Sequence, residues 1–201
     1  MSVKQTLNAC NHWIFDLDGT LTNSVHDFGH IRKELGLPES TPILEALKAM
    51  PAQQSATLWD KLNELELFYA SRASVMQGVI PVLERLCARG AQLAILTRNT
   101  MPVVMQTLET CGLDQYFPKQ HILDRDAFEP KPSPQGILHL LEQWQVQADK
   151  VVMVGDYLFD LQAGKSAGVV TVHIDLGGAF PWPELSDFCV RSFKEIMLDI
   201  T

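Results

Sequence analysis

Short apolar runs recur along the chain, and each one ends at a polar turn. The first run covers residues 12–15 (His-Trp-Ile-Phe). Four more runs follow it, at residues 92–96, 121–123, 151–154 and 169–174. Runs of this length between turn residues are typical of buried strands, and residues 151–154 are apolar throughout, as expected when helices cover both faces of a sheet. The pattern therefore predicts five strands.

Helical patterns separate the later runs. Residues 81–89 and 101–111 have a proline near the start and a glycine just after the end, which are common signals of helix boundaries. Residues 134–144 carry leucine and isoleucine at helical spacing. Strands that alternate with helices indicate βαβ units, so we predict an α/β fold with a parallel sheet.

The stretch between the first two runs differs, because residues 22–77 show helical patterns only. Helices are predicted at 25–35, 42–49 and 52–74, the last with an apolar stripe of Leu58, Leu62, Leu65 and Tyr69. We interpret 22–77 as a helical module inserted after the first strand, hinged near 22–23 and 77–78, with residues 1–21 and 78–201 as the α/β core. The alternative is that these are ordinary helices of the main domain.

Composition and charge narrow the classes of function. The chain has 201 residues, of which 46% are hydrophobic, and its 16 basic and 24 acidic side chains give a net charge of −8. This length suits one domain with a modest insertion, with a core large enough to fold without disulfides or a structural metal. The negative charge argues against a nucleic-acid partner, and it means that local positive groups or a bound cation must hold any small anionic substrate.

Targeting and redox signals point to the cytoplasm. Residues 1–10 lack the apolar segment of a secretory signal, and no run of about 18 apolar residues predicts a membrane span. The cysteines are far apart in sequence and fit buried thiols of a reduced compartment: Cys10, Cys87, Cys111 and Cys189. We expect a cytoplasmic monomer with no membrane partner.

Two carboxylates follow the first strand, in the sequence Asp16-Leu17-Asp18-Gly19-Thr20. Ligands of open α/β sheets bind beyond the carboxyl ends of the strands, so this turn is where a site is expected. One carboxylate can act as a nucleophile and metal ligand while the other exchanges protons, and Gly19 lets the backbone turn sharply. An acidic turn or a calcium loop is the alternative.

Two further turns carry groups suited to an anion. Thr97-Arg98-Asn99 follows the second strand, where a hydroxyl and backbone N–H groups suit anionic oxygens, although Thr97 could instead be an N-cap. Lys131 lies between two prolines that restrict the local chain, so its ammonium could neutralise a phosphoryl group and a nearby carboxylate. A solvated loop lysine is the alternative.

Asp156 and Asp160 follow the most apolar run. Hard oxygen ligands on a turn after a buried strand suit Mg²⁺, and Asp160 would lie one helical turn beyond Asp156. Asp160 could equally be a helix-start acid stabilised by the helix dipole. All four turns follow strands of the same predicted sheet, so they are expected to meet at one edge.

With these four segments in this order, the chain resembles the haloacid dehalogenase-like hydrolase superfamily. The resemblance runs from about Trp13 to Ile174, and it is to the phosphatases with a small helical cap, the phosphoglycolate phosphatase-like subgroup. It implies a Rossmann-like core with a parallel five-stranded sheet, in which residues 22–77 form the cap.

The resemblance also implies roles for the acidic residues. Asp16 would be the nucleophile that becomes phosphorylated, and Asp18 would protonate the leaving oxygen and then deprotonate the attacking water. Mg²⁺ would be bound by Asp16, the backbone carbonyl of Asp18 and Asp156, with Asp160 in support.

The same resemblance assigns the phosphoryl-binding groups. Thr97 and backbone amides near Arg98 and Asn99 would bind phosphoryl oxygens, and Lys131 would pair with Asp16 and the phosphoryl group. The implied activity is that of a Mg²⁺-dependent phosphatase acting on a small phosphorylated metabolite.

Asp18 separates this chain from two groups of relatives. Family members that cleave carbon–halogen bonds lack this second aspartate, and the transport ATPases carry Asp-Lys-Thr-Gly-Thr at this turn. A phosphomutase using the same residues, or a non-catalytic phosphate-binding regulatory protein, remains as an alternative function.

The cap is expected to close over Asp16 and select the leaving group, with His26, His30, Arg32 and Arg72 as candidate contacts. A zinc site at His26 and His30 is a weaker hypothesis. Residues 163–166 (Ala-Gly-Lys-Ser) look like the end of a phosphate-binding loop, but they are better explained as a helix end. Residues 177–183 are expected to be a loop whose aromatic side chains pack back onto the core.

Overall fold

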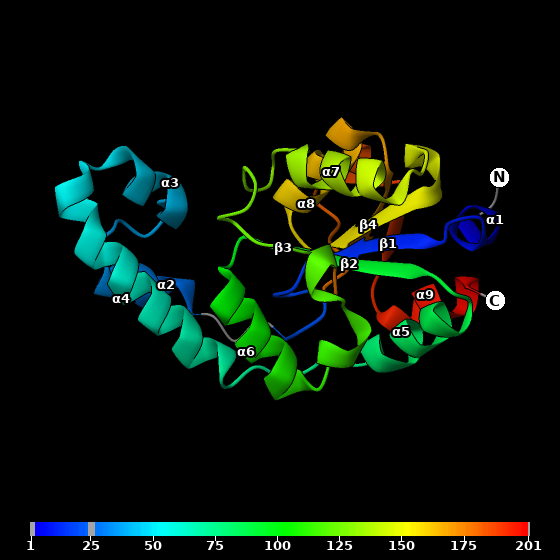
Figure 1. The fold of residues 1–201 in the computed structure, drawn as a ribbon, viewed down its shortest axis with the longest axis horizontal. Helices are drawn as coiled ribbons and strands as arrows, with labels where there is room; N and C mark the ends of the chain where they lie inside the picture. The colour runs from blue at the N-terminus through cyan, green and yellow to red at the C-terminus, as the bar shows by residue number, and fades with distance from the viewer. Residues whose placement is uncertain (1–2, 24–26, 201) are drawn as a thin grey trace.

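The computed structural model describes residues 3–23 and 27–200. In this part of the chain a single six-stranded sheet has the order β3-β2-β1-β4-β5-β6, and all neighbouring strands are parallel (Figure 1). The strands are β1 (His12–Phe15), β2 (Gln92–Leu96), β3 (Ile122–Leu123), β4 (Val151–Gly155), β5 (Val170–Ile174) and β6 (Phe188–Val190). The predicted Rossmann-like α/β fold is therefore confirmed.

The prediction of five strands is wrong by one, because β6 extends the sheet beyond β5. It pairs through His173 with Cys189 and Ile174 with Val190. β6 is an edge strand of three residues, of which only Val190 is buried. A strand of three residues is too short to show a clear alternation of apolar and polar side chains in the sequence. Its pairing with β5 is what defines it as a strand.

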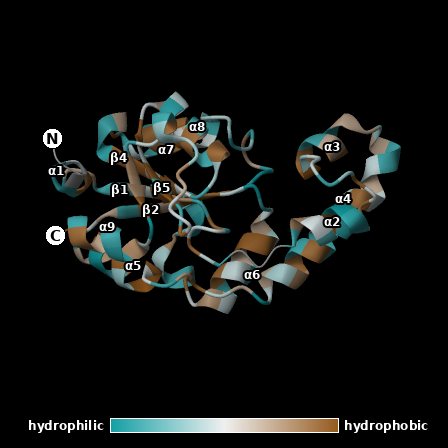
Figure 2. Ribbon diagram, turned by 180° about the vertical axis from the view of Figure 1, so that it is seen from behind, coloured by the Kyte–Doolittle hydropathy of each residue, from teal (hydrophilic) through white to brown (hydrophobic). Residues whose placement is uncertain are grey.

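Helices cover both faces of the sheet, and the alternation along the strands decides which side chain meets which face. Trp13 and Phe15 belong to an apolar cluster with α5, α6 and α9, whereas Ile14 belongs to a second cluster with α7 and α8. The helices of the core are α1 (Val3–Asn8), α5 (Val79–Ala88), α6 (Met101–Cys111), α7 (Gln135–Trp144), α8 (Leu158–Ala167) and α9 (Phe193–Asp199). Short 3-10 turns are η1 (Asp114–Tyr116), η2 (Lys119–His121), η3 (Ala148–Lys150) and η4 (Pro183–Leu185). Figure 2 shows the hydrophobic residues gathered on the central strands between these layers.

Helices α2 (Phe28–Glu34), α3 (Ile43–Ala49) and α4 (Ala52–Ala70) form the inserted module, which lies to one side of the sheet in Figure 1. They pack around their own buried apolar cluster, made of Ile31, Leu35, Leu44, Leu47, Leu62 and Tyr69. Helix α4 runs back from this module and packs beside α6 of the core.

The two connections to the inserted module pair with each other. Thr22 forms an antiparallel bridge with Val75, and the amide of Asn23 donates to the carbonyl of Ser74 at 2.9 Å. Helix α4 ends at Ala70, before the predicted end at residue 74, and residues 74–75 pair with the other connection instead. Helix α2 begins at Phe28, after the N-cap Asp27.

Several secondary expectations are also settled. The four cysteines are free, but Cys87 and Cys189 are exposed, so the expectation of buried thiols is wrong for these two. In the described part of the chain, no helix combines the length and apolar character that crossing a bilayer requires. Residues 163–166 lie within the last turns of α8, where Lys165 pairs with Asp187, as the helix-end interpretation requires.

The loop at residues 177–183 packs back onto the core as expected. Phe180 and Trp182 are half-buried, and their ring centroids lie 5.5 Å and 5.4 Å from the ring of His173 in β5. The carboxylate of Asp175 holds the start of this loop by accepting hydrogen bonds from the amides of Gly177, Ala179 and Phe180, each at 2.9 Å.

Asp187 ties the edge of the sheet together, because its carboxylate accepts from the amide of Thr171 at 2.9 Å and from Lys165 at 2.5 Å. Partial burial opposes ionisation, yet these bonds lower the pKa of Asp187 below its usual value. We expect Asp187→Ala to lower the free energy of unfolding by about 1–3 kcal/mol at pH 7. The folded-state pKa is the lower one, so the carboxylate's contribution is full above pH ~5, begins to fall near the unfolded-state pKa of ~4, and is lost as the pH falls through the lower folded-state pKa.

Urea denaturation at pH 7 and at pH 3 measures both effects. The exposed Glu109, changed to Gln on α6, is the matched control and should leave the stability within about 0.5 kcal/mol of the wild type. A difference between wild type and Asp187→Ala that does not shrink at pH 3 would contradict this account.

Candidate active site

The polar turns predicted from the sequence meet at the carboxyl edge of the sheet. Asp16 directly follows β1, where its amide donates to the carbonyl of Val154 in β4 at 2.9 Å. Thr97 follows β2, Asp156 follows β4, and the loop after β3 brings Lys131 in from the far side of β2. The order β3-β2-β1-β4 places β1 in the middle, so Asp16 is central to the group.

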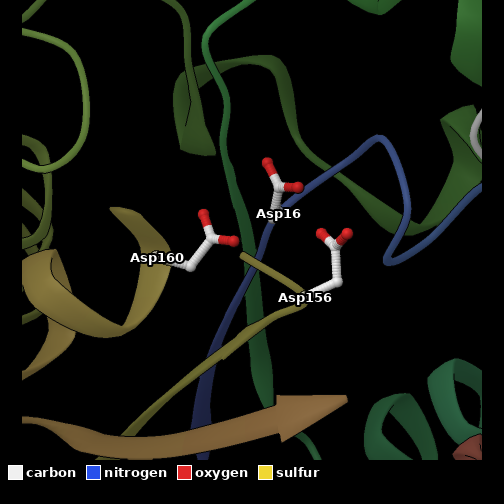
Figure 3. A group of neighbouring side chains, drawn as sticks. All are labelled: Asp16, Asp156 and Asp160. Atoms are coloured by element: carbon white, nitrogen blue, oxygen red, sulfur yellow. The ribbon is translucent and has the colours of Figure 1, made fainter. Parts of the chain in front are cut away.

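Three carboxylates point toward one another at this edge, from Asp16, Asp156 and Asp160 (Figure 3). Each offers an oxygen, and these oxygens lie within 4.8 Å of one another. Burial, and then the neighbouring carboxylates, raise the pKa of Asp16 well above its usual value. Burial and Asp160 raise the pKa of Asp156 to about 7, although Thr20 donates a hydrogen bond to it at 3.2 Å. The cluster therefore holds more negative charge than its protein neighbours balance.

Lys131 supplies positive charge inside this cluster. Its Nζ lies 2.5 Å from Oδ1 of Asp16 and 2.6 Å from Oδ1 of Asp160, and its side chain is only 2% exposed. Burial alone would favour the neutral amine, but the two carboxylates outweigh it and raise the pKa of Lys131, so the ammonium form is kept. The alternative of a solvated loop lysine is wrong.

Asp160 holds the lysine and also begins a helix. Its Oδ2 accepts from the amide of Tyr157 at 3.0 Å, in a capping box at the start of α8, while its Oδ1 faces Lys131. Both oxygens of Asp160 are thus engaged by the protein, which makes it a support for Lys131 and for the cluster.

The donor set fits a divalent cation. Carboxylate oxygens on buried turns are the hard ligands that Mg²⁺ prefers, and three carboxylates face a single ammonium here. A cation at this edge would lower the carboxylate repulsion that raises the pKa of Asp16 and Asp156. Among the described residues, this is the one group of three acidic, histidine or cysteine side chains with such spacing.

Asp18 is held by the loop after β2. Its Oδ2 accepts a hydrogen bond of 2.5 Å from the side-chain amide of Asn99. Thr97 does not cap α6, whose N-cap is Thr100, so the N-cap interpretation is wrong. The hydroxyl of Thr97 accepts instead from the amide of Asn99 at 3.1 Å, which tightens the loop that presents Asn99 to Asp18.

Arg98 turns its side chain toward the inserted helices. Its Nη2 lies 2.5 Å from Glu45 on α3, and its guanidinium stacks 4.7 Å from the ring centroid of Phe159. The guanidinium of Arg98 therefore forms part of the cleft wall and does not contact the carboxylate cluster.

A cleft of about 420 Å³ separates the cluster from the inserted helices. The core side contributes Asp16, Asp18, Thr97, Asn99, Lys131 and Asp156, and the inserted helices contribute mainly apolar groups, among them Phe28, Ile31, Ile43, Leu44 and Leu62. The side of the cleft that the core forms, here called its floor, is thus charged. The opposite side, formed by the inserted helices and here called its roof, is largely apolar.

Of the candidate substrate contacts that the structure describes on the inserted helices, one lines the cleft and two do not. Arg32 lines the cleft, and its Nε donates to the carbonyl of Thr41 at 2.9 Å. His30 hydrogen-bonds Tyr69 at 3.1 Å, and Arg72 stacks 3.7 Å over the ring of Phe68, so neither is part of the cleft wall. His26 lies outside the described residues.

Several functional neighbours have no obvious signal in the sequence. Gly155 is one, because a Cβ at this position would overlap the side chain of Asp160. Gly19, which the sequence already indicates as a turn residue, has a φ of +84° and also leaves room for the carboxylate of Asp156. Two ion pairs, Arg125 with Glu66 and Arg98 with Glu45, join the core to the inserted helices. A charged residue shortly after β3 is the only hint that could have drawn attention to Arg125.

Comparisons with known proteins agree with this geometry. A model of the haloacid dehalogenase-like hydrolase family matches residues 13–174. A phosphoglycolate phosphatase of Vibrio parahaemolyticus is 30% identical, covering 91% of this chain and 92% of the relative. One of Aquifex aeolicus is 33% identical, covering 79% and 81%. The crystal structure of a predicted phosphoglycolate phosphatase from Haemophilus somnus has a TM-score of 0.73 at 23% identity, covering 94% of this chain and 97% of that one.

The contact between Gly155 and Asp160 generates a test of the cluster. We expect Gly155→Ala to displace Asp160 and loosen Lys131, lowering stability by about 1–3 kcal/mol and hydrolysis of p-nitrophenyl phosphate by more than about tenfold. Glu109→Ala, at an exposed position of α6, is the control and should change neither quantity. Full activity in a folded Gly155→Ala variant would show that the placement of Asp160 is dispensable.

Proposed function

We propose that this chain, which belongs to the haloacid dehalogenase-like hydrolase family and to its phosphoglycolate phosphatase-like subgroup, hydrolyses a small phosphomonoester through a phosphorylated Asp16 with the help of Mg²⁺. It is a phosphatase in class. The observation that carries the mechanistic proposal is the buried ammonium of Lys131, which bridges Asp16 and Asp160 next to Asp156. This arrangement concentrates opposite charges where a phosphoryl dianion must meet a carboxylate.

In the first half of the proposed reaction, a carboxylate oxygen of Asp16 attacks phosphorus and the bond to the leaving oxygen breaks. Asp18 gives its proton to that oxygen, so the alcohol leaves neutral. In the second half, Asp18 takes a proton from water, which attacks the phosphorus of the acyl phosphate and releases inorganic phosphate. Asp16 and Asp18 return to their starting states.

The residues that would hold Mg²⁺ are Asp16, Asp156 and the backbone carbonyl of Asp18, with Asp160 in support. When bound, the ion supplies positive charge that offsets the repulsion between a phosphoryl dianion and the nucleophile. Lys131 contributes in the same way from the other side of Asp16, and its fixed position requires little rearrangement during the reaction.

The loop after β2 is proposed to receive the phosphoryl oxygens. The hydroxyl of Thr97 and backbone amides near Arg98 and Asn99 lie in the turn between β2 and α6, at the same edge as Asp16, and the amide of Asn99 itself already donates to Thr97. The side chain of Asn99 has a second role in this proposal, because it orients the carboxylate of Asp18.

The decisive measurement is phosphate release from p-nitrophenyl phosphate, with Mg²⁺ and with EDTA. We expect turnover only with Mg²⁺, and a fall of more than about a thousandfold in Asp16→Asn. Asp126→Asn, at an exposed position after β3, is the matched control and should retain activity. If no turnover is seen, incubation with acetyl phosphate and mass spectrometry decides the matter: absence of a phosphorylated Asp16 as well would contradict the proposal.

Residues 22–77 are proposed to act as a cap that selects the leaving group. The support for this is the apolar roof of the cleft, which faces the charged floor where the phosphoryl group would lie. The paired connections at Thr22 and Val75 are the only covalent links between the cap and the core, so we infer that the cap can move about them while α2–α4 keep their own packing.

Phe28 offers a clean test of the cap's role. Its side chain is 48% exposed and lines the cleft, whereas Phe68 is 49% exposed on α4 but does not line it. We expect Phe28→Ala to change the ratio of kcat/KM between bulky and small phosphate esters by about tenfold, and Phe68→Ala to leave this ratio unchanged. Equal ratios in both variants would contradict selection by the cleft roof.

A further inference from the structure

Arg125 connects the cap to the turn that holds Asp18. It is the second residue after β3, does not line the cleft, and its side chain is 4% exposed. Within the mechanism above it has no chemical role, yet it is a fully charged group that the fold has removed from water. Burying a guanidinium is costly unless good partners compensate for it, so the partners of this residue are informative.

On the cap side, three residues of α4 hold the guanidinium, whose carbon lies 5.6 Å from the ring centroid of Trp59. Nη1 lies 2.7 Å from Oε1 of Glu66, and Nη2 donates to Oδ1 of Asn63 at 3.0 Å. Glu66 is almost as buried as Arg125, at 10% side-chain exposure. The other cap–core ion pairs are more exposed, and the pair of Lys48 with Glu129 spans 3.8 Å with both side chains more than half exposed. Exposed pairs of that kind contribute little.

On the core side, Arg125 holds the loop after β2 at two points. Its Nη1 donates to the carbonyl of Arg98 at 3.2 Å, and its backbone amide donates to the carbonyl of Asn99 at 3.0 Å. These bonds restrain the backbone on both sides of Asn99, whose side chain donates to Asp18 at 2.5 Å. A continuous chain of contacts thus runs from α4 through Arg125 and Asn99 to Asp18.

We propose that Arg125 is a positioning residue that couples the seating of the cap to the orientation of Asp18 as proton donor. The inference rests on the function proposed above. When the cap is seated, Glu66 and Asn63 fix the guanidinium, the guanidinium fixes the Arg98–Asn99 backbone, and Asn99 aligns the carboxylate of Asp18. When the cap lifts, the guanidinium loses its partners on α4, so proton donation is efficient only under the seated cap.

A leaving-group series distinguishes this role from a general structural one. Aryl phosphates range from p-nitrophenyl phosphate, whose leaving group departs without a proton, to phenyl phosphate, whose leaving group needs one more strongly. We expect Arg125→Met to lower kcat/KM for phenyl phosphate about tenfold more than for p-nitrophenyl phosphate. Asp18→Asn sets the full size of this differential effect, and Glu129→Gln, which breaks the exposed cap–core pair, should show none.

Glu66→Gln is the second variant, since it keeps the shape of the side chain and removes the charge that holds Arg125. It should give the same differential loss at smaller size, and it decides the question if Arg125→Met does not fold. Equal losses across the aryl series in the folded variants, whatever their magnitude, would overturn the proposal. A wild-type protein without turnover on any ester and without phosphorylation of Asp16 would instead count against the proposed function.

Discussion

The buried contact of Lys131 with Asp16 and Asp160 is the interaction on which the rest of the site depends. Three carboxylates within 4.8 Å of one another repel strongly away from water, and one ammonium is the only side-chain cation in direct contact with them among the described residues. Three separate elements bring the contacting groups together: Asp16 follows β1, Lys131 lies in the loop after β3, and Asp160 lies in the first turn of α8. The remaining negative charge is what makes the edge suitable for a divalent cation and, with it, a phosphoryl group.

Backbone geometry sets how closely these groups approach. Gly155 leaves space for Asp160, and Gly19, at a φ of +84°, leaves space for Asp156. The same turn leads straight into the cap, because Asp18 bridges to Thr22 and Thr22 bridges to Val75. The proposed proton donor, Asp18, and the paired connections of the cap are therefore neighbours along the backbone, which gives the proposed coupling a short path.

In the proposed function, the core carries the chemistry and the cap selects the leaving group. The charged floor belongs to the core, where each polar group follows a strand and inherits the rigidity of the sheet. The roof belongs to three short helices with a cluster of their own, and it is mostly apolar. Ion pairs from Arg98 to Glu45 and from Arg125 to Glu66 join the two parts. Of these, the buried pair at Arg125 reaches the loop that orients Asp18.

The sequence by itself determined the parallel α/β core, the helical insertion and the residues at the carboxyl edge, because strand periodicity, helix boundaries and the turns at Asp16, Thr97, Lys131 and Asp156 are local patterns. Tertiary structure decided that β6 joins the sheet, that Arg98 faces the cap, that Thr97 supports its own loop and that Arg125 meets Glu66, 59 residues away in the chain. The residues next to a charged side chain in the sequence do not indicate which distant residue it will pair with. Its role is set by which distant residues the packed sheet and helices bring within hydrogen-bonding distance.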